Sequence, residues 1–129
     1  MKTLRVGIAS YDEMKARTLA IAGGKYRPGP DEPKVWFSSA ESFARILSDR
    51  NRSLLRVIAE SAPGSLAELA ELTSRKKSNL SRTLKTMERF GFVRLSRGAR
   101  GTLIPRVSYQ RISLTLPLSK PERVGNEAA

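Results

Sequence analysis

The chain has 129 residues and a formal net charge of +12, because 24 Lys and Arg stand against 12 Asp and Glu, and it contains no histidine or cysteine. Without imidazole or thiolate groups, the usual zinc sites and the Ser-His-Asp and Cys-His catalytic arrangements are excluded. So large a positive excess is self-repulsive unless a polyanion neutralises it, which indicates nucleic acid or an anionic surface as the partner. We therefore expect a binding protein rather than an enzyme, with no catalytic residue, cofactor or metal.

The apolar stretches of the chain are only a few residues long, whereas a helix that spans a membrane needs about 20 apolar residues. The first ten residues, MKTLRVGIAS, lack the apolar region of a signal peptide. We therefore expect a cytoplasmic protein with no membrane association. A chain of this length accommodates one domain with a hydrophobic core and a short appended element.

The N-terminal segment shows the pattern of a strand followed by a helix. Leu4, Val6 and Ile8 alternate with other residues, which is typical of a half-buried strand. Ser10 and Glu13 have the spacing of a capping box, which starts a helix that a Gly-Gly pair ends. A proline-containing linker follows. We predict that residues 1–33 form a strand-helix extension and linker, available for dimerisation or for binding a partner.

Helical patterns dominate the first part of the next region, after a short extended piece at 34–37. The first expected helix begins at Ser38 or Ser39, and the second runs from near Asp49 to a residue before Pro63. The third begins at a capping box of Ser65 and Glu68. The fourth begins at Lys76 and ends near Phe90. A glycine follows the last of them, as is common at the end of a helix. We predict one domain over residues 34–118 and a flexible tail over 119–129.

Beyond this helix the apolar period changes to two, which predicts a hairpin formed by 92–95 and 102–104. Gly98 and Gly101 are expected to supply positive φ angles in its turn, so that Arg97 and Arg100 project from the tip.

A last strand carries Ile112, Leu114 and Leu116 on one side. This strand is expected to pair with the N-terminal strand, either within one subunit or between subunits, because exposed strand edges invite association. Three aromatic residues are expected to be packing anchors or plain core residues: Tyr11, Trp36 and Phe37.

Positive charge is concentrated in one segment of the chain. Residues 75–111 contain 11 Lys and Arg but a single acid, Glu88. Within this segment, a helix from Lys76 would bury Leu80, Leu84 and Met87 on one side. Its opposite side would be basic or hydrogen-bonding, which suits the major groove of DNA.

The expected contacts to DNA fall into three groups. Three residues near the helix start are assigned to base edges: Ser78, Asn79 and Arg82. Four cations are assigned to phosphates, with Ser81 on the flank of the same surface: Lys76, Lys77, Lys85 and Arg89. The hairpin is expected to place arginines in the adjacent minor groove: Arg94, Arg97 and Arg100.

The segment LAELT followed by SRKKSNLSRTLKTMERFGFVRL resembles the core of MarR-like winged helix-turn-helix regulators. KSNLSRTLKTME corresponds to the recognition helix of that family, and GFV to its exit into the wing. The resemblance implies an α+β fold, a winged helix-turn-helix with a short N-terminal strand-helix extension. Lys76 and Lys77 stand where the family commonly has a small capping residue. The chain also lacks the long flanking dimerisation helices of full-length MarR proteins, so its layout is closer to short prokaryotic regulators, some of which are antitoxins.

These observations favour a sequence-specific regulator of transcription that binds a palindromic site in double-stranded DNA as a homodimer. We expect it to act as a repressor. One alternative is an antitoxin whose N-terminal 35 residues neutralise a toxin while the winged helix autoregulates the operon. A further alternative is a nonspecific nucleoid or RNA-binding protein.

Overall fold

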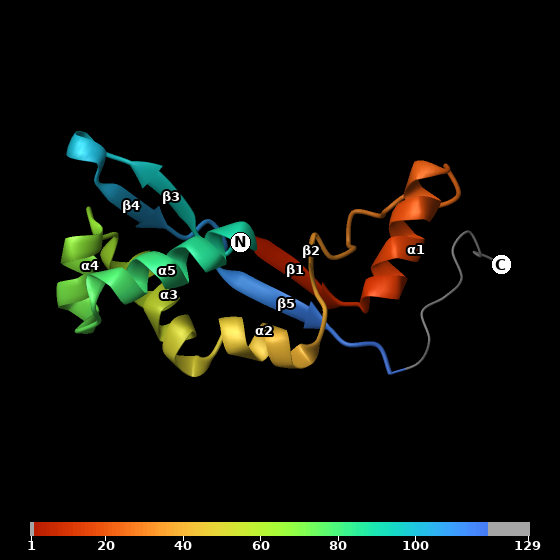
Figure 1. Cartoon of the computed structure of the whole chain (residues 1–129), viewed down its shortest axis with the longest axis horizontal. Coiled ribbons are helices and arrows are strands. Elements are labelled where there is room, and N and C mark those ends of the chain that lie inside the picture. Colours follow the sequence, from red (N-terminus) through yellow and green to blue (C-terminus); the bar gives the residue numbers. More distant parts are fainter. Residues whose placement is uncertain (1, 119–129) are drawn as a thin grey trace. The chain divides into compact units, whose positions relative to one another are not determined.

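The computed structural model describes residues 2–118, which form a mixed α+β fold (Figure 1). Its elements in chain order are β1 (Thr3–Ile8), α1 (Tyr11–Ala22), β2 (Val35–Phe37), α2 (Ala40–Ile46), α3 (Asp49–Ser61), α4 (Leu66–Thr73), α5 (Lys77–Arg89), β3 (Arg94–Arg97), a 3₁₀ turn (Ala99–Gly101), β4 (Leu103–Arg106) and β5 (Arg111–Thr115). No helix among the described residues is both long enough and apolar enough to cross a membrane. The predicted flexible tail, 119–129, lies outside the described residues.

The described chain divides into two compact units. The helix–hairpin unit comprises residues 44–111 and Lys2, and the sheet unit comprises residues 3–43 and 112–118. Sequence reasoning placed a boundary at residue 33, whereas β2 belongs with β1 in the sheet unit. The reason is pairing between distant parts of the chain, which a change in local composition does not reveal.

The sheet unit is built on three strands in the order β2-β1-β5. β1 pairs in parallel with β2, with Val6 opposite Val35 and Ile8 opposite Phe37. Leu4 and Val6 are buried, as the alternating pattern predicted. Because β5 lies beside β1 in the same chain, the pairing of the first and last strands is made within one subunit.

Helix α1 begins as predicted but buries none of its side chains. The Ser10 Oγ accepts a hydrogen bond from the Glu13 N–H at 3.1 Å, and the Ser10 N–H donates to Glu13 Oε1 at 2.7 Å. The expectation that Tyr11 is a packing anchor is wrong, since 77% of this residue is exposed. Its position explains this, because Tyr11 is the first residue of a helix in which no residue is fully buried.

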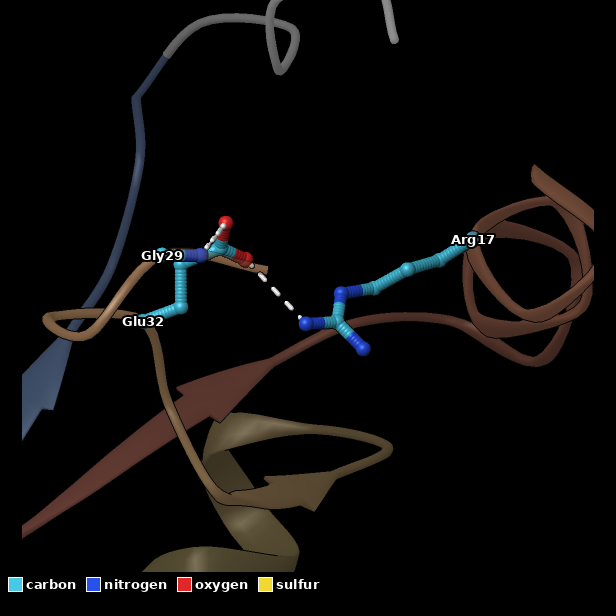
Figure 2. Close-up of polar contacts among 3 residues, drawn as sticks. All are labelled: Arg17, Gly29 and Glu32. Carbon is cyan, nitrogen blue, oxygen red and sulfur yellow. Dashed lines mark hydrogen bonds and ion pairs between the residues drawn. The ribbon is translucent and has the colours of Figure 1, made fainter. Parts of the chain in front are cut away.

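The proline-containing linker is attached to the sheet unit by polar and aromatic contacts. Arg17 of α1 donates to Glu32 Oε1 at 3.1 Å, and Glu32 Oε2 accepts from the Gly29 N–H at 3.1 Å (Figure 2). The Arg17 guanidinium also lies 5.7 Å from the centre of the Tyr26 ring and 5.1 Å from that of Trp36. Trp36 is therefore a packing anchor, as expected, and its ring makes a cation–π contact with Arg17.

In the helix–hairpin unit, three helices and the start of the hairpin share one apolar core. Ser48 and Ser65 cap α3 and α4 by accepting from the Asn51 and Glu68 N–H groups. The Glu68 carboxylate accepts from Gly64, one residue earlier than a capping box requires. The buried core residues of this unit are Leu47, Leu54, Ile58, Leu66, Leu69, Leu80, Leu84, Met87, Phe92 and Val93.

The hairpin follows α5, with β3 and β4 antiparallel and Leu95 opposite Pro105. The positive φ angles of its turn are at Arg100 and Gly101, at 60° and 75°. The prediction of a positive φ at Gly98 is wrong, since its φ is −103°. A side chain at Gly98 is disfavoured for a different reason, because a Cβ there would lie 2.6 Å from Ile104 Cδ1.

Candidate nucleic-acid interface

The orientation of α5 is set by three side chains that are completely buried. Leu80, Leu84 and Met87 each have 0% of their surface exposed, as the helical spacing predicted. These residues recur every three or four positions, so they lie on one side of the helix. Burying this side directs the polar side of α5 outward.

The polar residues predicted to contact DNA are accessible along α5 and at its start. Those exposed are Lys76, Lys77, Ser78, Asn79, Arg82, Lys85 and Arg89, while Ser81 is half-buried. Thr86, on the flank, donates from its hydroxyl to the Arg82 carbonyl at 3.2 Å. We call the accessible surface formed by these eight residues the α5 face; its side chains are all basic or hydrogen-bonding.

Within residues 2–118, no Lys or Arg of the α5 face has a carboxylate within 4.0 Å. Glu88 is the acid nearest in sequence, and its Oε2 accepts from the Leu95 N–H at 3.2 Å. This acid therefore joins the end of α5 to β3.

The start of α5 differs from the starts of α1, α3 and α4, which are all capped by serine. Its N-cap residue is Lys76, with φ −68° and ψ 139°, and Lys76 makes no side-chain cap. The first N–H groups of a helix point outward and carry a partial positive charge. With a lysine in place of a serine, the N-cap side chain accepts from none of these groups.

The hairpin arginines are accessible but do not lie together. Arg94 is at the base of the hairpin, opposite Arg106, whereas Arg97 and Arg100 are near the tip. Arg97 donates to the Gly101 carbonyl at 3.3 Å, so its guanidinium lies along the turn. In Figure 1 the hairpin runs back from the end of α5, with its tip toward the end at which α5 begins.

Arg106 has a structural role in the same hairpin. Its Nη1 donates to the carbonyls of Pro63 and Pro105, each at 2.7 Å. It thereby joins β4 to the turn before α4, although in the sequence it counted only as part of the basic segment.

Sequence reasoning gave no role to Arg75, which lies in the turn between α4 and α5. Burial, followed by the charge of Arg50, lowers the pKa of Arg75 below its ordinary value. Its Nη1 donates to Asn51 Oδ1 at 3.4 Å, and Asn51 donates in turn to the Ile46 carbonyl at 3.0 Å. The run of charge in the sequence contained Arg75, but only the fold brings it to α3.

A shallow pocket of about 180 Å³ lies beside Arg82, between the middle of α5 and the region where α2 ends and α3 begins. It is lined by Ile46, Asn51, Arg82, Thr83, Thr86 and Met87. Arg82 therefore forms one wall of a depression and also belongs to the α5 face.

The model of a family described as HVO_A0114 matches residues 46–114, which include α3, α4, α5 and the hairpin. No curated protein and no solved structure matches the chain.

Proposed function

We propose that this chain, which belongs to the HVO_A0114 family, is a sequence-specific double-stranded DNA-binding regulator of transcription. In this proposal α3, α4, α5 and the β3–β4 hairpin work as a winged helix-turn-helix. The α5 face enters the major groove, and the hairpin tip enters the adjacent minor groove. The observation that carries the proposal is the division of α5 into a completely buried apolar side and an opposite accessible side that carries Ser78, Arg82, Lys85 and Arg89.

The residue types on the α5 face support contacts to bases as well as to phosphates. Arg82 can pair bidentately with guanine and Asn79 with adenine, and Ser78 can donate or accept. Lys76, Lys77, Lys85 and Arg89 supply phosphate contacts, which fix the position of the helix without selecting a sequence. The uncapped start of α5 adds backbone donors to the same set.

One recognition helix covers only a few base pairs, so we further propose a homodimer on a palindromic site. Within this proposal the protein acts in the cytoplasm as a repressor.

The test starts with a selection of bound sequences from random duplex DNA by the full chain. Arg82→Ala should then weaken binding to the selected duplex by about 1–3 kcal/mol. It should thereby reduce the difference in binding free energy between the selected duplex and random DNA. Arg56→Ala is the matched control, because Arg56 is an exposed arginine of α3 outside the α5 face. Equal losses on both DNAs, or a selection without enrichment, would indicate a nonspecific binder instead.

A further inference from the structure

A second pocket, of about 290 Å³, lies between α3 and the turn that joins α4 to α5. It is lined by Arg50, Ser53, Leu54, Val57, Thr73, Ser74 and Arg75. Two of these side chains are guanidinium groups, three carry hydroxyls, and none is an acid. The pocket lies wholly within the helix–hairpin unit.

The two arginines of this pocket lack a counter-ion among residues 2–118, since neither has a carboxylate within 4.0 Å. The Arg75 Nε is buried and has no hydrogen-bond acceptor in the described chain. The only hydrogen bond of the Arg75 side chain within residues 2–118 is from its Nη1 to Asn51 Oδ1, and it is long, at 3.4 Å. Holding two like charges together, one of them half-buried, costs free energy that a bound anion would offset.

The three hydroxyl groups of the pocket differ in whether their proton is already donated within the described chain. Thr73 donates its hydroxyl proton to the Leu69 carbonyl at 2.8 Å, so this donor is engaged within α4. Ser53 and Ser74 make no such hydrogen bond within the described chain, and their hydroxyls can donate to a ligand. The pocket thus combines two guanidinium groups with two hydroxyl donors.

We propose that this pocket binds a phosphate group through Arg50 and Arg75. Guanidinium groups match the oxygen atoms of a phosphate bidentately, and charge-assisted hydrogen bonds of this kind are among the strongest in proteins. The phosphate belongs either to the DNA backbone or to a phosphorylated small molecule. Only the DNA source rests on the proposed function. In that case the bound phosphate lies next to the start of α5, because Arg75 is two residues before Lys77.

The primary experiment is calorimetric titration of the full chain with inorganic phosphate at constant ionic strength. Arg50→Gln and Arg75→Gln should each weaken phosphate binding by about tenfold or more, since each removes charge-assisted hydrogen bonds. Arg56→Gln, with the same loss of charge on an exposed side of α3, should leave phosphate binding unchanged. Circular dichroism verifies folding, and if Arg75→Gln does not fold, Arg50→Gln decides the outcome.

A second arm measures the affinity of the same proteins for a short duplex. If the two pocket variants lose both phosphate binding and DNA affinity relative to Arg56→Gln, the pocket holds a backbone phosphate. If they lose phosphate binding alone, it holds a free ligand, and this result stands even if the wild-type chain does not bind DNA. The proposal is overturned if neither arm separates the pocket variants from Arg56→Gln.

Discussion

Arg17 of the sheet unit and Arg82 of the helix–hairpin unit are both helical arginines, but their surroundings differ. Arg17 has a side chain only 21% exposed, donates to Glu32 and lies over the Trp36 ring. Arg82 is exposed and has no carboxylate within 4.0 Å among the described residues. Arg17 thus binds the linker of its own unit, whereas Arg82 is accessible to a partner.

The same contrast holds for acids. Glu32 of the sheet unit accepts from Arg17 and from a backbone N–H, so it neutralises a cation and orders the linker. Glu88 of the helix–hairpin unit accepts from the Leu95 backbone and neutralises no cation of the α5 face. Among residues 2–118, the cations of the α5 face therefore have no carboxylate within 4.0 Å, as expected if this face meets a polyanion.

The largest expected effect tests whether these free cations bind phosphates. With about six to ten phosphate contacts per dimer, affinity for DNA should fall by about 10³–10⁵-fold between roughly 50 and 200 mM salt, because bound cations release counterions from DNA. Fluorescence anisotropy with a labelled duplex measures this slope. A nearly flat response would mean that the α5 face does not meet the DNA backbone.

The next effect concerns the buried side of α5, which orients its accessible side. Leu84→Ala should reduce the free energy of unfolding by about 2–5 kcal/mol, because it opens a cavity at a completely buried position. Leu72→Ala is the matched control, since Leu72 in α4 is 50% exposed and its truncation should cost much less. Urea denaturation compares the two, and similar losses would show that Leu84 does not anchor the helix.

Features determined by neighbouring residues in the chain could be predicted from the sequence. The capping box of Ser10 and the apolar side of α5 depend on spacings of three or four residues, and both were predicted correctly. The alternation in β1 likewise predicted the burial of Leu4 and Val6, whereas Ile8 is only half-buried. The accessibility of the α5 face follows from the same spacing.

Features determined by contacts between distant residues could not be predicted in this way. Gly98 was assigned to a positive φ, but its φ is −103°, and a Cβ there would instead require the Ile104 side chain of the opposite strand to shift. Arg75 was only one charge in a basic run until the fold placed it beside Arg50 and Asn51. The composition of a segment does not specify such neighbours, so the second pocket has no signature in the sequence.

The smallest expected effects compare a cation that is paired within the sheet unit, Arg17, with a cation that is accessible on the α5 face, Lys85. Both stability and DNA affinity are measured for each variant. Arg17→Gln should lower the free energy of unfolding by about 1 kcal/mol, because it removes a partly buried ion pair and an aromatic contact, and should leave DNA affinity unchanged. Lys85→Gln should leave stability within about 0.5 kcal/mol of wild type and should lower the salt slope of DNA binding by about two, roughly one for each subunit of the proposed dimer. Both variants remove one positive charge, so a general effect of net charge would act on them equally. Equal losses of DNA affinity in the two variants would therefore show that the charge of the whole chain, rather than the position of Lys85 on the α5 face, governs binding.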